Sequence, residues 1–199
     1  MTAEPKTTKG RRTRAHLVNA GRTVFARDGY VDARMSDVAT EAETSLGALY
    51  RYFGNKEDLF AQVIADLHED LFQSSTSSHD FAQEPYQVLL DANRGYLELY
   101  QKNGAVMKAF IQAAHVEDRF RKIWWDMRER HVQRFVQALK ASHGITDVNG
   151  IRTDVLTESM ACMVEQSAYV WFSNPAEPAI DLQDAIAAVS NNWYAAFFG

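Results

Sequence analysis

Two long stretches of this sequence, residues 6–84 and 86–174, contain no proline. Because proline removes a backbone donor and clashes inside a helix, its absence permits long helices without requiring them. The positive evidence comes from the apolar residues, which recur three or four positions apart along much of the chain. The stripe that runs from Phe120 through Met127 to Leu139 is the longest example. This spacing places apolar side chains on one face of a helix and predicts helices throughout the chain.

Turn-forming residues separate the predicted helices. Gly29, Gly54 and Gly104 lie at such breaks, as do the Ser-rich segment 74–80 and the segment 144–150. No run of alternating apolar and polar residues is long enough to predict a strand, and the sequence contains no internal repeat. We therefore expect an all-α fold of about nine helices.

The net charge of −5 conceals an asymmetry along the chain. Residues 1–56 contain ten Lys and Arg against six Asp and Glu, a net charge of +4. Residues 57–199 contain eleven against twenty, a net charge of −9. A small basic module on a larger acidic body is therefore predicted, and the basic part is the candidate for binding nucleic acid.

Several other classes of protein are disfavoured by the sequence. Cys162 is the only cysteine, which excludes a disulfide within the chain and a cysteine-based zinc site. Apolar stretches such as 185–189 are far shorter than the roughly 20 residues of a membrane span. The basic N-terminus is not followed by an apolar stretch, so a secretory signal is not predicted. We expect a cytoplasmic protein without a membrane partner.

Enzymatic function is also disfavoured. The sequence has no Glu-x-x-His pair, no His-Glu-x-x-His motif, no Gly-rich phosphate loop and no Gly-x-Ser-x-Gly elbow. His115 and His131 lie in predicted helices, where a structural role is the more common one. We expect no catalytic residues, no metal site and no cofactor.

Residues 34–53 have the pattern of a helix-turn-helix motif. Met35 and Ala42 lie on one face of a short helix, residues 43–45 interrupt it, and Leu49 and Phe53 lie on a second short helix. Two short helices bury little surface alone, so they must dock on the helix that precedes them. In this layout the second helix can enter the major groove of DNA.

The string TSLGALYRYFGNKEDLF at residues 44–60 closely resembles the signature of TetR-family transcriptional regulators. The resemblance is strong over about residues 11–71 and elsewhere covers only the number and layout of helices. It implies a helix-turn-helix DNA-binding domain at 11–71 and a ligand-binding and dimerisation domain at 72–199. We expect residues 1–10 to form a disordered basic tail.

The predicted DNA-binding residues surround the second helix of the motif. Ser45 can cap that helix, and Gly47 permits close approach of the backbone to DNA. By resemblance, Tyr50, Tyr52 and Lys56 match the family's phosphate-contacting positions. Tyr50 also fits a half-buried packing role beside Leu49. The full predicted set is Arg34, Thr44, Ser45, Leu46, Gly47, Ala48, Tyr50, Tyr52 and Lys56.

The motif departs from the family pattern at three positions. Family members usually have Gly where this chain has Glu43, an apolar residue at Thr44, and Thr where this chain has Arg34. A left-handed backbone is costly for Glu, so either the turn differs or Glu43 points away from DNA. Arg34 cannot cap the first helix as Thr would, but it could reach a phosphate.

The basic residues before the motif leave two interpretations open. They can bind phosphate or reach into a flanking minor groove, or they can form a solvated end of the chain. These residues are Lys6, Lys9, Arg11, Arg12 and Arg14.

The C-terminal body is rich in Met and aromatic residues. Such residues usually form core, but they also line cavities for bulky apolar ligands. By resemblance, helices at about 152–173 and 180–198 form a homodimer interface, and a cavity for a hydrophobic or aromatic molecule lies among 86–101, 105–114 and 119–140. The candidate lining residues are Tyr96, Met107, Phe110, Trp124, Met127 and Met163. Arg94, Arg128 and Glu165 could point inward or form exposed ion pairs.

These predictions combine into a homodimeric regulator that binds an inverted repeat in double-stranded DNA. By resemblance it is a repressor that a hydrophobic small molecule releases from its operator. One alternative is a helical ligand-binding protein that no longer reads DNA, and Glu43 is its only support. Another is a non-specific architectural DNA-binding protein, against which the acidic body counts.

Overall fold

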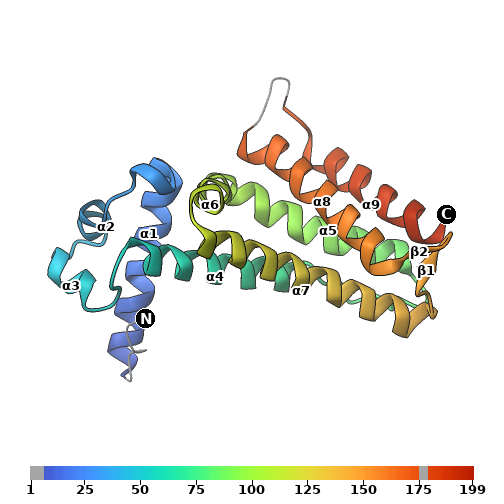
Figure 1. The fold of residues 1–199 in the computed structure, drawn as a ribbon, viewed down its shortest axis with the longest axis horizontal. Coiled ribbons are helices and arrows are strands. Elements are labelled where there is room, and N and C mark those ends of the chain that lie inside the picture. Colours follow the sequence, from blue (N-terminus) through green and yellow to red (C-terminus); the bar gives the residue numbers. More distant parts are fainter. Residues whose placement is uncertain (1–6, 175–178) are drawn as a thin grey trace. The chain divides into compact units, whose positions relative to one another are not determined.

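A computed structural model describes residues 7–174 and 179–199, and within these ranges the chain is almost entirely helical (Figure 1). The described residues form nine α-helices, one π-helical turn and one short two-stranded sheet, which confirms the predicted all-α fold. No helix among them is both long enough and apolar enough to cross a membrane. The helices are α1 (Thr8–Asp32), α2 (Met35–Glu41), α3 (Leu46–Tyr50), α4 (Lys56–Ser74), α5 (Pro85–Lys102), α6 (Gly104–Val116), α7 (Asp118–His143), α8 (Thr153–Ala168), η1 (Tyr169–Ser173) and α9 (Leu182–Phe198).

The expectation that the chain contains no strand was wrong at one place. Strands β1 (Asp147–Val148) and β2 (Ile151–Arg152) pair antiparallel around a two-residue turn. Asn149 and Gly150 in that turn have positive φ angles of 53° and 79°. Two-residue strands are too short to show alternation in the sequence, but Asn-Gly is the most characteristic sequence of such a hairpin turn.

The chain divides into two compact units. The first contains the described residues up to Glu69 together with Ala105–Arg121, and the second contains Asp70–Gly104 and Lys122–Gly199. The predicted boundary near residue 71 is close to the first division point. The grouping of residues 105–121 with the N-terminal helices could not be read from sequence order, because it depends on which helices pack together.

Aromatic side chains form the centre of the first unit. The rings of Phe25 and Phe60 are 4.5 Å apart between centroids, and Phe120 lies 5.2 Å from Phe60 and 5.1 Å from Tyr30. All four side chains are buried. Since Phe120 comes from α7, this cluster explains why the start of that helix belongs to the same unit as α1 and α4.

Helix α1 begins at Thr8, inside the segment 1–10 for which we expected disorder. The Thr7 hydroxyl accepts a hydrogen bond from the Gly10 amide at 3.1 Å, which caps the helix and starts it earlier than the apolar pattern suggested. Residues 1–6, including Lys6, lie outside the described residues. Of the other basic residues, Arg14 donates to the side chain of Gln62 at 2.7 Å, and Lys9 and Arg12 are exposed.

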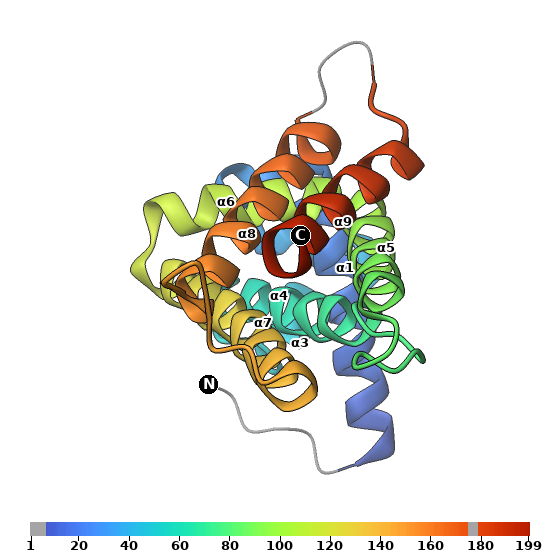
Figure 2. The same cartoon turned by 90° about the vertical axis from the view of Figure 1, so that its right-hand side faces the viewer.

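The second unit is a helical bundle in which α5 packs along α9 and α8 lies beside α9 (Figure 2). The Phe135 ring on α7 lies 4.7 Å from Trp193 and 5.0 Å from Phe197 on α9. Helix α5 also passes very close to the end of α4. A β-carbon at Gly95 would lie 1.9 Å from the carbonyl oxygen of Ser74, so only glycine fits there.

Candidate nucleic-acid interface and ligand cavity

The first helix of the predicted motif is α2, and its apolar side faces the core of the first unit. Met35, Val38 and Ala39 are buried. Arg34 precedes the helix and makes no capping hydrogen bond with its side chain, as expected for a residue that replaces Thr. The Arg34 side chain is exposed. It therefore remains available to an external anion.

The turn between α2 and α3 has the tight geometry of a helix-turn-helix, although this chain has Glu43 where the resemblance predicts Gly. Glu43 adopts a left-handed backbone with a φ of 48°, and its side chain is exposed. The amide of Thr44 donates to the carbonyl oxygen of Ala39 at 2.9 Å and closes the turn. The turn thus keeps its shape with Glu in place of Gly, at a conformational cost of about 1–2 kcal/mol.

Helix α3 is held in place by a cap at its start and by buried side chains in and after it. The Ser45 hydroxyl accepts a hydrogen bond from the Ala48 amide at 3.2 Å, so Ser45 caps the helix as predicted. Leu49 and the following Phe53 are fully buried and anchor the helix on the core. Arg14 places its guanidinium 4.9 Å from the centre of the Phe53 ring.

The opposite side of α3 is open to solvent. Leu46 and Tyr50 expose 41% and 45% of their surface, large fractions for apolar and aromatic residues. No atom lies within 4 Å of the position that a β-carbon on Gly47 would take, so nothing in the protein obstructs a close approach there. Thr44, Ala48 and Tyr52 are half-buried at the edges of this surface.

Sequence reasoning missed one basic residue at this surface. Arg51 follows α3 directly and is exposed. It lies one residue from Tyr50 and therefore adds a positive charge beside the exposed face. The signal was present in the motif string, where an arginine stands between the two tyrosines.

Lys56 has two partners within the protein, which the sequence did not suggest. Its ammonium donates to the carbonyl oxygens of Tyr30 at 2.8 Å and Val31 at 3.2 Å. It also lies 4.6 Å from the centre of the Tyr30 ring. Lys56 therefore binds main-chain carbonyl oxygens in the last turn of α1, just after Gly29, where the backbone leaves helical geometry with a φ of 75° and a ψ of 178°. This accounts for a lysine at the start of α4 without a phosphate.

Three further contacts hold the start of α4 and the end of α1 in place. The side-chain oxygen of Asn55 accepts a hydrogen bond from the Asp58 amide at 2.7 Å and so caps α4. The Tyr30 hydroxyl donates to the carboxylate of Glu117, and burial together with this carboxylate raises the pKa of Tyr30. Arg119 pairs with Asp58 at 2.9 Å. The motif is thus built on a base of hydrogen bonds between α1, α4 and the residues around the start of α7.

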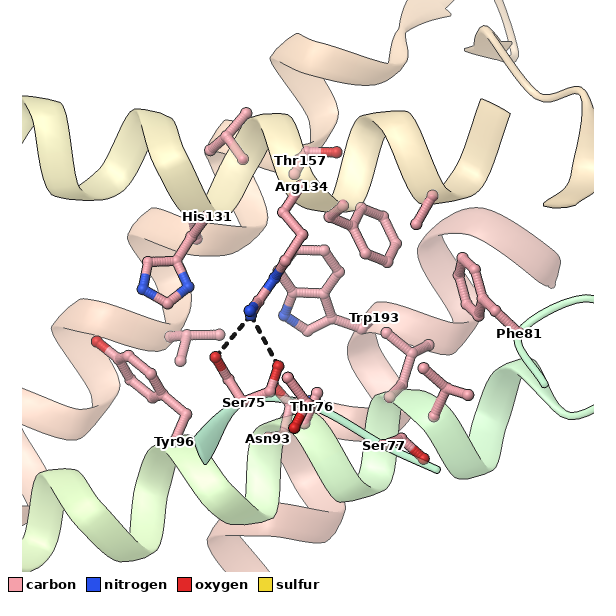
Figure 3. A pocket seen from close by; sticks show the side chains of 18 of the residues that line it. Ser75, Thr76, Ser77, Phe81, Asn93, Tyr96, His131, Arg134, Thr157 and Trp193 are labelled. Carbon is pink, nitrogen blue, oxygen red and sulfur yellow. Dashed lines mark hydrogen bonds between the residues drawn. The ribbon is translucent and has the colours of Figure 1, made fainter. Parts of the chain in front are cut away.

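The second unit contains a cavity of about 340 Å³ (Figure 3). Helices α5, α7, α8 and α9 and the segment after α4 form its walls. Its apolar lining includes Phe81, Val88, Leu89, Phe135 and Val164. A volume of this size is at the lower end of the range for small-molecule sites, about 300–1,000 Å³.

The six predicted pocket residues do not converge on this cavity. Tyr96 lines it. Met107 and Phe110 are buried on α6 in the first unit. Trp124 and Met127 on α7 and Met163 on α8 belong to the second unit but are not among the lining residues. Apolar spacing identifies the buried side of a helix, but it does not tell which part of that side faces a cavity.

Charged residues line one part of the cavity. Arg128 and Glu165 both contribute and pair with each other, with Nε and Oε1 3.1 Å apart. Burial lowers the pKa of Arg128, but the hydrogen bond to Glu165 and the nearby negative charges, of which Glu165 is the largest, together raise it above its usual value. Burial, with a smaller contribution from Glu165, raises the pKa of Tyr96. Arg94 instead donates to Gln183 at 3.0 Å and does not line the cavity.

Comparison with known families supports the identification of the motif. Residues 17–63 match the family model described as bacterial regulatory proteins, tetR family. The matched range begins within α1, contains α2 and α3 and ends within α4. It therefore covers the whole of the predicted DNA-binding surface except its basic N-terminal residues.

Curated relatives and a solved structure agree with this match. The HTH-type transcriptional repressor SCO4008 of Streptomyces coelicolor is 34% identical over 87 residues, which are 44% of this chain and 45% of that protein. The HTH-type transcriptional repressor DhaR of a Mycobacterium species is 25% identical over 150 residues, 74% of each protein. The alignment with SCO4008 thus spans less than half of that protein's length. The crystal structure of a tetR-family transcriptional regulator from Streptomyces coelicolor superimposes with a TM-score of 0.77 at 16% identity, over 93% of this chain and 80% of that one.

Proposed function

We propose that this chain, whose residues 17–63 match the model of the tetR family of bacterial regulatory proteins, is a sequence-specific DNA-binding transcriptional repressor. The observation that carries the proposal is the exposed face of α3, where Leu46, Gly47 and Tyr50 are open to solvent while Leu49 is buried. A short helix with one buried side and one free side is suited to entering a major groove. The family consists of transcriptional regulators, and we infer no catalytic activity.

In this proposal different residues have different roles at the DNA. Leu46, Ala48 and Gly47 face the base edges, where an apolar side chain can contact a thymine methyl group. Thr44, Ser45, Tyr50 and Tyr52 contact phosphates through hydroxyl groups. Arg34 and Arg51 supply charge at the two ends of the motif. Lys56 acts mainly by fixing the motif on α1, because its ammonium already has two carbonyl partners.

The protein is proposed to bind DNA as a homodimer through residues 152–173 and 180–198. An exposed stripe supports this, with Val155, Cys162 and Val170 along α8 and η1 and Ala188 and Ala195 on α9. Val155 leaves 53% of its surface uncovered. Small side chains on this stripe would let two helix pairs approach closely, and a two-fold dimer matches an inverted repeat.

Sedimentation velocity with paired substitutions tests the dimer. Ala188→Arg places a long charged side chain on the proposed interface, and Ala141→Arg places the same side chain on an exposed position of α7. Dissociation by the first and not by the second is expected. A dimer that survives Ala188→Arg unchanged would contradict this interface.

The cavity of the second unit is proposed to hold a small-molecule effector that lowers affinity for DNA. The effector can shift the equilibrium only by its differential affinity for the free and DNA-bound conformations. The supporting observation is the apolar lining with a few polar and charged side chains, which is typical of ligand sites.

Selection of bound duplexes from fragmented genomic DNA tests the central proposal. Enrichment of one inverted repeat is expected, followed by titration of that repeat at two salt concentrations. Tyr50→Phe and Arg51→Gln should weaken binding, and Arg51→Gln should also reduce the salt dependence. A well-folded dimer that enriches no sequence would favour the alternative of a ligand-binding protein that no longer reads DNA. Steep salt dependence without site preference would favour an architectural protein.

A further inference from the structure

Arg134 gives this cavity a net positive charge, which an ordinary apolar pocket does not have. Three charged side chains line the cavity, and two of them, Arg128 and Glu165, neutralise each other. Arg134 has no carboxylate within ion-pair distance among residues 7–174 and 179–199. The lining therefore carries one positive charge that the described protein does not balance.

The partners of Arg134 are all uncharged. Its Nη1 donates to the carbonyl oxygen of Phe72 at 2.7 Å. Its Nη2 donates to the carbonyl oxygen and the hydroxyl of Ser75 at 2.7 and 2.6 Å, the two bonds drawn in Figure 3. Burial, with the nearby charge of Arg130, lowers the pKa of Arg134, but an arginine side chain keeps its proton in proteins. The Nε–H group has no hydrogen bond within the described residues.

Two further polar groups at the cavity are buried without a partner. Trp193 exposes 8% of its surface and Thr157 exposes 0%, and both line the cavity. Within the described residues, neither the Trp193 Nε1–H group nor the Thr157 hydroxyl has a hydrogen-bond partner. An indole N–H can only donate, as can a guanidinium N–H. The cavity thus offers one buried donor that lacks an acceptor, the Trp193 Nε1–H group, and a buried hydroxyl on Thr157 that can supply another.

A carboxylate satisfies these groups better than a neutral polar group does. It only accepts hydrogen bonds, and it carries the single negative charge that Arg134 leaves unbalanced. An amide or alcohol would bring a donor into a region that already has too many. At another part of the cavity, the carboxylate of Asp91 accepts a hydrogen bond at 2.7 Å from the hydroxyl of Ser77, which is a lining residue. The negative charge of Asp91 disfavours an anion beside Ser77, so the carboxylate of a ligand is expected beside Arg134.

The rest of the cavity fits an apolar body. Phe81, Val88, Leu89 and Phe135 contribute hydrocarbon and aromatic surface. A volume of about 340 Å³ corresponds to on the order of ten water-sized groups. An apolar chain or ring system with one carboxylate matches both the size and the lining.

We infer that the cavity takes a small amphipathic monocarboxylate, with its carboxylate at Arg134 and Trp193 and its apolar part against Phe81, Leu89 and Phe135. This inference rests on the proposed function of the cavity as an effector site. It adds a carboxylate to the hydrophobic or aromatic ligand that the sequence predicts.

Calorimetry on the full chain tests the inference with matched pairs of probes. Octanoate and 4-phenylbutanoate are compared with their primary amides, which keep the shape but lose the charge. We expect at least one acid to bind roughly tenfold or more tightly than its amide, as is common for hydrogen bonds to charged groups. An amide that binds as tightly as its acid in both pairs would overturn the inference, as would the absence of binding by either acid.

Two variants and a control locate the carboxylate. Arg134→Gln should reduce the acid-to-amide affinity ratio to near one, while Arg94→Gln, which removes an arginine that does not line the cavity, should leave the ratio unchanged. Because Arg134 also binds the end of α4, Trp193→Phe serves as a second variant that keeps an aromatic ring and loses the donor. We expect severalfold weaker acid binding in Trp193→Phe, and a ratio that persists in both variants would overturn the inference.

DNA binding, measured separately by fluorescence anisotropy, distinguishes the two proposals. An acid that binds the cavity but does not release DNA would support the ligand class and contradict the effector role. Release of DNA by neutral compounds alone would support the effector role and overturn the monocarboxylate.

Discussion

The ammonium of Lys56 lies 2.8 Å from the main-chain carbonyl oxygen of Tyr30 and 4.6 Å from the centre of the Tyr30 ring. This contact joins the start of α4 to the end of α1 across 26 positions of sequence. Lys56, a lysine of the predicted DNA-binding set, therefore helps to hold the motif together. A role in stability predicts that replacing Lys56 lowers the free energy of unfolding, whereas a role in phosphate binding predicts weaker DNA binding alone.

We predict that Lys56→Met lowers the free energy of unfolding by about 1–2 kcal/mol in the absence of DNA, because a charged donor and a cation–π contact are lost. Urea denaturation of the purified chain measures this change. Lys9→Met, at an exposed position of α1, is the control and should have little effect. If Lys56→Met left the free energy of unfolding unchanged but weakened DNA binding, Lys56 would act only by binding phosphate.

Glu43→Gly should stabilise the protein. The backbone at Glu43 has a φ of 48°, a conformation that glycine adopts without the steric cost borne by other residues. We expect a gain of about 1 kcal/mol in the free energy of unfolding relative to Glu43→Ala, which removes the charge but keeps the strain. Both variants should bind DNA more tightly than the natural chain, because each removes a negative charge beside α3. Equal stabilities of the Gly and Ala variants would contradict the strain.

Gly95→Ala should be strongly destabilising. The added β-carbon would lie 1.9 Å from the Ser74 carbonyl oxygen, so α4 and α5 must move apart. We expect a loss of about 3 kcal/mol in thermal or urea unfolding, at the upper end for overpacking. Gly47→Ala provides the comparison, because no atom lies within 4 Å of its new β-carbon and the fold should tolerate it. Similar unfolding curves for the two variants would show that the helices can separate at no cost.

The stability of the second unit should depend weakly on pH through His79. A hydrogen bond from His79 Nδ1 to Glu84 at 3.0 Å raises the pKa of His79 above its usual 6.5. A raised pKa in the folded state stabilises the protein below the unfolded value, and this contribution disappears as pH rises through the folded value. His79→Gln should therefore be less stable than the natural chain at about pH 5.5, and the difference should vanish at about pH 8.5. A difference that grows with pH would contradict this sign.

Helices and caps were the features best predicted from the sequence. The Ser45 cap and the two short helices of the motif agree with the structure. Each depends on residues only a few positions apart, so a local pattern contains the necessary information. The hairpin around Asn149 was missed because its strands are shorter than one period of alternation.

The sequence by itself determined the helical order of the chain and the helix-turn-helix motif, because apolar spacing and capping act within one or two helical turns. Only the tertiary structure decided that Lys56 contacts Tyr30, and that Tyr96, Arg134 and Trp193 line one cavity while Met107 does not. These relationships join residues on different helices, and they depend on how the helices pack. A stripe of apolar residues specifies that a helix side is buried, but not which neighbour it meets.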